Sequence, residues 1–239
     1  MGRRIKLWRD PYGEGFELYQ KKSVTFKPGL TVLVGCNGIG KTTLLRNIKS
    51  ELSEKKIPVL KFDNLSDAHN LKFKGSSFGD LDVNYLATTM CSSEGEGIVN
   101  NMTNLASYIG KFIKTAEYDL DGMKRISKSL NKIIGKEDDE DASVSNERWI
   151  LLDAVDSGLS VDNIIDLKEY LFKPVIEHAK SLDKEIYIIV SANEYEMARE
   201  EQCFDVYNCK YIKFKSYDDY RNIIIESRTN KDKRYEETE

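Results

Sequence analysis

The sequence has few cysteines, and it has no hydrophobic run long enough to cross a membrane. Its four cysteines include no C-x-x-C pair, which argues against a disulfide framework and favours reduced thiols in a cytoplasmic protein. No apolar segment reaches the roughly 20 residues of a transmembrane helix, so no membrane insertion is expected. The basic start of the chain is followed by no apolar signal segment. The four cysteines are Cys36, Cys91, Cys203 and Cys209.

A large excess of one charge is also missing. The net charge is −4, from 36 basic and 40 acidic residues among 239. This balance excludes a protein that is basic over its whole surface, although a local nucleic-acid face remains compatible with it. The length suits one medium α/β domain that carries a small helical insertion.

The most informative stretch runs from Gly35 to Thr42 and reads GCNGIGKT, which fits the phosphate-loop pattern G-x-x-x-x-G-K-[ST]. It lies between an apolar run at 30–34 and a helix-forming segment, as that pattern requires. Glycines let backbone N–H groups converge on phosphate oxygens, and the following helix adds its positive end. The stretch predicts a nucleoside triphosphate site, in which Lys41 contacts the β- and γ-phosphates and Thr42 binds Mg²⁺. The expected binding residues are Asn37, Gly38, Ile39, Gly40, Lys41, Thr42 and Thr43.

Two further polar residues follow predicted strands. Asp153 ends the apolar run 149–152, and Asn193 follows the run 186–190. Ligands of open α/β folds bind at the carboxyl edge of the sheet. We therefore expect Asp153 to join Thr42 at Mg²⁺ and Asn193 to contact a γ-phosphate, with Lys41, Asp153 and Asn193 as the catalytic set.

The expected fold class is α/β, a P-loop NTPase with a mostly parallel central sheet and an N-terminal antiparallel strand region. Short strands are predicted at 5–8, 16–19, 24–26, 57–62 and 211–214, and residues 222–227 fit a helix or a strand. A helical insertion with an acidic tip occupies about 97–147, and Pro174 is expected to kink or divide a later helix. One domain thus covers 1–228, followed by a charged tail at 229–239.

Several residues have two interpretations. Tyr12 and Phe16 either stack on an adenine base or pack the small N-terminal sheet. Ser93 is either a helix N-cap or part of an anion site. A row of lysines at 124, 128 and 132 either contacts nucleic-acid phosphates or is a solvated helix face.

The loop, the stretch Ser93-Glu94-Gly95-Glu96 and the segment from Leu151 to Ser160 together resemble ABC-type ATPases of the soluble kind related to Rad50, SMC and RecF proteins. The resemblance implies that Ser93, Gly95 and Glu96 form a degenerate signature motif facing the loop of a second subunit. It further implies ATP and Mg²⁺ sandwiched in a homodimer that forms on ATP binding. DNA or a protein is the partner that the family would suggest.

The chain departs from that family at three places. Ala154 stands where the family has a catalytic glutamate, and Asn193 stands where it has a histidine. No glutamine occurs among residues 63–70, where Asp63, Asn64 or Asp67 either substitutes for it or belongs to a solvated loop. We therefore expect slow hydrolysis. The alternatives are a non-hydrolysing ATP-dependent switch or scaffold, or the ATP-binding subunit of a transporter.

Overall fold

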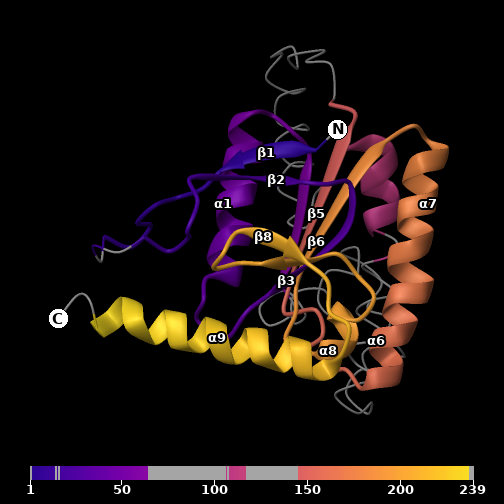
Figure 1. The fold of residues 1–239 in the computed structure, drawn as a ribbon. Coiled ribbons are helices and arrows are strands. Elements are labelled where there is room, and N and C mark those ends of the chain that lie inside the picture. Colours follow the sequence, from indigo (N-terminus) through magenta and orange to yellow (C-terminus); the bar gives the residue numbers. More distant parts are fainter. Residues whose placement is uncertain are drawn as a thin grey trace, which may run out of the picture.

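The computed structural model describes residues 2–13, 15, 17–63, 106, 108–116 and 145–236, with side chains to residue 234 (Figure 1). Its central feature is a six-stranded sheet in the order β4-β5-β6-β3-β7-β8. Neighbouring strands pair in parallel, except for β7 and β8, which are antiparallel. The strands are β3 (Gly29–Val34), β4 (Val59–Asp63), β5 (Glu147–Asp153), β6 (Glu185–Ser191), β7 (Cys203–Asp205) and β8 (Lys210–Ile212).

Helices cover both faces of this sheet, so its central strands are buried and continuously apolar. One face packs against α1 (Lys41–Glu54) and the antiparallel pair β1 (Arg3–Lys6) and β2 (Ser23–Phe26). The other face packs against α6 (Val161–Leu167), the π-helix η1 (Lys168–Phe172), α7 (Lys173–Ser181) and helical residues 108–115. The short helix α8 (Tyr195–Ala198) follows β6 on that second face.

These observations confirm the predicted fold class: an α/β fold with a mostly parallel sheet and an N-terminal antiparallel strand pair. The helix around Pro174 is divided as expected, because the π-helical η1 precedes it and Pro174 lies in the first turn of α7. In the part of the chain that the structure describes, no helix is both long and apolar enough to span a bilayer.

The strand predicted at 16–19 is wrong over its described residues, 17–19, which form no strand. Leu18 and Tyr19 are consecutive, yet both are buried, at 5% and 3% exposure. A strand would point them to opposite faces. They instead pack beneath the phosphate loop, which is more favourable than extending a small sheet.

The chain end also differs from the prediction of a charged tail. Helix α9 (Tyr217–Glu236) continues through most of residues 229–239 and runs along one edge of the molecule (Figure 1). Its charged residues are interspersed with inward-facing residues. Ser227 and Arg234 are buried at 3% and 6% exposure, and the Arg234 guanidinium lies 4.7 Å from the centre of the Tyr207 ring.

Candidate nucleotide-binding site

The predicted phosphate loop connects β3 to α1. Its glycines Gly35, Gly38 and Gly40 all have positive φ, at 145°, 80° and 114°, a region that other residues rarely adopt. At Gly40 a Cβ would also lie 3.0 Å from Leu18 Cδ2. The Tyr19 hydroxyl donates a hydrogen bond to the Gly40 carbonyl at 3.0 Å. Residues 18 and 19 therefore support the loop from below.

Lys41 is the first residue of α1, and its side chain folds back over the loop. Its Nζ donates to the Gly35 carbonyl at 2.7 Å and lies 3.4 Å from the Cys36 carbonyl. Burial lowers the pKa of Lys41, whereas Cys36, Asp156 and Asp153 nearby raise it. The ammonium is thus already at the loop, held by neutral carbonyls that anionic phosphate oxygens can replace.

Asp153 ends β5, and Ser191 ends the neighbouring strand β6. The Ser191 hydroxyl donates to Asp153 Oδ1 and accepts the backbone N–H of Ala154 at 3.0 Å. Ser191 therefore fixes both the carboxylate and the residue after it. This contact was not predicted, although Ser191 stands at a strand end two residues before the predicted site residue Asn193.

Asn193 is positioned through its backbone. Its N–H and that of Glu194 both donate to Asp156 Oδ2 at 2.7 Å, and its carbonyl accepts the Tyr220 hydroxyl at 2.6 Å. Asp156 is 1% exposed. Burial raises its pKa, while the N–H groups of Glu194 and Asn193 and the charge of Lys41 lower it. Asp156 is therefore a positioning residue that ties the turn after β5 to the turn after β6.

Most of the predicted site residues line one pocket of about 400 Å³. It brings together the loop, the first residues of α1, the end of β5 and the turn after β6. Ile39 does not line it, because its side chain is fully buried in the core below α1. The predicted site residues that do line it are Asn37, Gly38, Gly40, Lys41, Thr42, Thr43, Asp153 and Asn193.

Tyr12 also lines this pocket. Its ring is 57% exposed, and its hydroxyl lies 2.6 Å from Thr43 Oγ1. This exposure favours the base-stacking interpretation over packing in the small N-terminal sheet. An exposed ring beside α1 leaves an aromatic face for a base to stack on.

Several predicted residues lie outside the described ranges: Phe16, Asn64, Asp67, Ser93, Gly95 and Glu96, together with the lysine row and the acidic tip. Asp63 is described, at the end of β4, but it is not among the residues that line the pocket.

The donor set in the pocket fits Mg²⁺ bound with a nucleotide. Magnesium prefers oxygen ligands and is often held by one or two protein groups plus substrate phosphates. Thr42 offers a hydroxyl, and Asp153 offers a carboxylate with about four acceptor positions, of which Ser191 uses one. Both residues line the same pocket.

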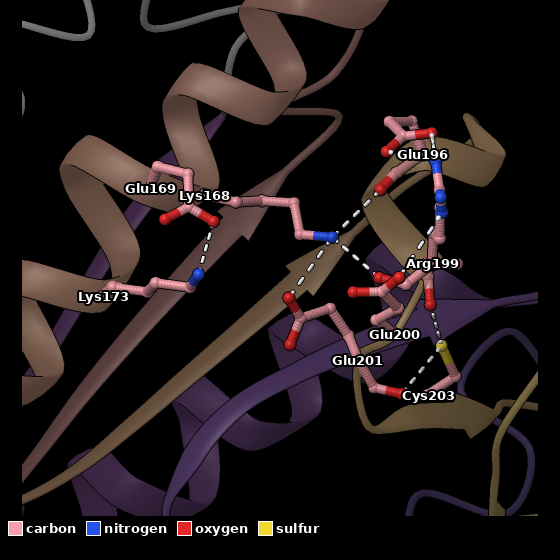
Figure 2. Close-up of polar contacts among 9 residues, drawn as sticks. Lys168, Glu169, Lys173, Glu196, Arg199, Glu200, Glu201 and Cys203 are labelled. Atoms are coloured by element: carbon pink, nitrogen blue, oxygen red, sulfur yellow. Dashed lines mark hydrogen bonds and ion pairs between the residues drawn. The ribbon is translucent and has the colours of Figure 1, made fainter.

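Lys168 holds helix α8, which follows Asn193, from its C-terminal side (Figure 2). Its Nζ donates to the carbonyls of Glu196 and Arg199 at 3.1 and 2.7 Å and lies 3.3 Å from Glu201 Oε1. The last carbonyls of a helix lack partners within the helix, so Lys168 satisfies one of them at Glu196, together with the carbonyl of Arg199 just after the helix. Asp156 accepts hydrogen bonds from the residues just before α8. The segment after β6 is therefore held by Asp156 before this helix and by Lys168 at its C-terminal end.

Replacing Lys168 with methionine is expected to lower the free energy of unfolding by about 1–3 kcal/mol, because two carbonyls and Glu201 lose a largely buried charged partner. Lys173→Met is the matched control, since Lys173 pairs with Glu169 in an exposed position on the same helical run (Figure 2). Denaturant unfolding should separate the two variants. Equal stability of both variants would contradict a clamp at Lys168.

Comparisons with known proteins found only a weak structural similarity. No protein-family model matches the sequence, and no curated protein matches it significantly. Among solved structures, the chain is similar to CbiO1 from Clostridium perfringens, described as part of the ABC transporter complex CbiONQ. That likeness has 15% sequence identity and a TM-score of 0.44, and it covers 87% of this chain and 86% of the other. It is too weak to establish a family, so the proposal below rests on the chain's own residues.

Proposed function

We propose that this protein is an ABC-type ATPase that binds Mg²⁺ and ATP and hydrolyses ATP slowly. The observation that carries the proposal is the convergence of three elements in one pocket: the phosphate loop with Lys41, Asp153 at the end of β5, and Asn193 after β6. Sequence position alone does not bring these residues together. Their arrangement suits the binding and polarisation of a triphosphate.

Each residue has a distinct role in this proposal. The N–H groups of the loop and the ammonium of Lys41 bind the β- and γ-phosphates. Thr42 and Asp153 hold Mg²⁺, which supplies charge neutralisation when it is bound. Asn193 presents its amide at the γ-phosphate end, and Tyr12 stacks on the adenine at the other end.

The proposal includes a dimer that closes on ATP. Ser93, Gly95 and Glu96 of one subunit would face the phosphate loop of the other, as the resemblance implies. Titration with Mg²⁺ and ATP tests this, with mass followed by light scattering and released phosphate measured in the same samples. We expect the mass to double on ATP binding while phosphate release stays slow. A mass that does not change with ATP would contradict the dimer.

Ser93→Arg should abolish ATP-induced doubling of mass while leaving nucleotide affinity of the monomer within about twofold, since bulk and charge would enter a shared interface. Ser92→Arg, one residue away, is the control for a general effect of the added charge. A loss of ATP affinity in the isolated Ser93→Arg monomer would instead indicate a contact within one subunit.

A second candidate function is a non-hydrolysing ATP-dependent switch or scaffold, and Ala154 is the observation that favours it. Ala154 lies in the pocket immediately after Asp153, where it offers no group that can accept a proton from water. Phosphate release that depends on Lys41 would exclude this candidate.

A further inference from the structure

A second pocket lies against the nucleotide site, between the phosphate loop and helix α9. Its volume is about 730 Å³, close to twice that of the first. The two pockets share Cys36, Asn37 and Asn193 as lining residues. They therefore meet where the loop faces the turn after β6, whereas Tyr12 lines the nucleotide pocket alone.

The two pockets differ sharply in charge. Among described residues, the nucleotide pocket is lined by one cation, Lys41, and one carboxylate, Asp153. The second pocket is lined by three cations and by no carboxylate among described residues. These cations are Arg221, Arg228 and Lys231. Three cations that line one pocket with no carboxylate among its described lining residues create a local positive potential that attracts an anion.

The three cations lie on one face of α9, because their spacings of seven and three residues match the helical repeat. This face is fixed against the loop. The Cys36 N–H donates to Ser227 Oγ at 2.8 Å, a buried hydrogen bond between residues 191 positions apart. This hydrogen bond thus fixes the position of helix α9 relative to the backbone of the loop.

Lys231 reaches the loop with its side chain. Its Nζ lies 3.5 Å from the Asn37 carbonyl and 3.8 Å from the Asp232 carboxylate, both at the long limit for such contacts. A Cβ placed on Gly38 would lie 3.5 Å from Lys231 Cδ. The side chain therefore lies over the tip of the loop, where its ammonium makes these two long contacts.

We propose that α9 supplies, within the same chain, the cations that contact the terminal phosphate of the bound nucleotide, with Lys231 first and Arg228 beside it. This inference rests on the proposed function and deepens it. A nucleotide whose base stacks on Tyr12 extends its phosphates past Lys41 toward Asn37 and Asn193. The terminal phosphate then reaches the boundary between the two pockets, where Lys231 exchanges a weak carbonyl contact for a phosphate oxygen.

The consequence is discrimination between ATP and ADP. Lys41 can contact the β-phosphate, which both nucleotides have, whereas Lys231 is placed to contact only the terminal phosphate that ADP lacks. Removing the Lys231 charge should therefore weaken the binding of Mg·ATP and leave that of Mg·ADP nearly unchanged. We expect a loss of about five- to twentyfold for ATP, smaller than at Lys41 because Lys231 is partly exposed.

The test measures the affinities of the full chain for Mg·ATP and Mg·ADP by calorimetry, for the parent and for Lys231→Met, Arg228→Met and Lys233→Met. Lys233 is the matched control, since it lies on the same helix but does not line the pocket. Support requires that Lys231→Met lose ATP affinity selectively, that Lys231→Arg restore it, and that Lys233→Met resemble the parent. Arg228→Met should show a smaller selective loss, and it remains informative if Lys231→Met folds poorly.

Three results would overturn the inference. Equal losses for ATP and ADP would mean that Lys231 only stabilises the loop. Unchanged ATP affinity would mean that the cations do not reach the phosphate, and an equal loss in Lys233→Met would indicate net charge alone. A parent chain that binds neither nucleotide would remove the proposed function itself. In the first three cases the parent still binds ATP, so the two failures are distinguishable.

Discussion

Replacing Lys41 with alanine is expected to lower the affinity for Mg·ATP by about ten- to a hundredfold, which corresponds to the roughly 1.5–3 kcal/mol of a charge-assisted contact. The ammonium already lies at the loop, within 2.7 Å of the Gly35 carbonyl. Little rearrangement is therefore needed before it contacts phosphate. Calorimetric titration of parent and variant measures the change directly.

Lys41→Met separates loss of charge from loss of packing, because methionine keeps most of the apolar stem of this buried side chain. Both variants should lose affinity for ATP and for ADP, in contrast to Lys231→Met. Thermal unfolding in the absence of nucleotide should show that each variant remains folded. If Lys41→Ala and Lys41→Met bind Mg·ATP as tightly as the parent, the phosphate-loop assignment is wrong.

Site residues could be predicted from the sequence where they belong to a contiguous motif or directly follow a predicted strand. The loop is a contiguous pattern, so spacing alone identified Lys41 and Thr42. Asp153 and Asn193 were found differently: each follows an apolar run, and the ends of parallel strands meet at one edge of a sheet. The structure places all four residues in one pocket.

The contribution of α9 could not be predicted in the same way. Ser227 contacts Cys36 across 191 positions, and no local rule relates residues so far apart. The composition beyond residue 229 also pointed to a solvated tail, because charged residues dominate it. One signal was available: Tyr220, Ile224, Ser227 and Lys231 recur at spacings of four, three and four, which is a helical face.

The error at residues 17–19 has a different cause. A short run of apolar and polar residues resembles a strand when its flanks contain turns. The burial of the adjacent Leu18 and Tyr19 comes from their contacts with Gly40, which lies in the loop. Tertiary packing therefore overrides local preference at the point where the chain supports the site.

Introducing glutamate at position 154 is expected to raise the rate of ATP hydrolysis by about a hundredfold or more, the range that a positioned general base contributes. Ala154 lines the pocket directly after Asp153, and its N–H is held by Ser191 at 3.0 Å. Because this hydrogen bond fixes the backbone, the side chain of a glutamate at position 154 would extend from a defined position. Phosphate release under single-turnover conditions measures the gain without interference from product release.

Ala154→Gln is the control that isolates the carboxylate. Ala154 has a φ of 51°, a left-handed conformation that costs any residue with a Cβ about 1–3 kcal/mol. Alanine, glutamine and glutamate share this cost, so stability should differ little among the three proteins. The glutamine variant has the size of glutamate but cannot accept the proton, and it should hydrolyse ATP no faster than the parent.

Asp156 is the competing candidate for the base, and its geometry argues against that role. Its Oδ2 accepts two backbone N–H groups at 2.7 Å, its side chain is buried, and it does not line the nucleotide pocket. Asp156→Asn should therefore disturb the position of Asn193 while leaving the pH profile of hydrolysis unchanged. Fast turnover in the parent that disappears in Asp156→Asn would move the base to Asp156. If Ala154→Glu and Ala154→Gln both behave like the parent, position 154 does not face the attacking water, and the alignment of this segment with the ABC-type pattern is wrong.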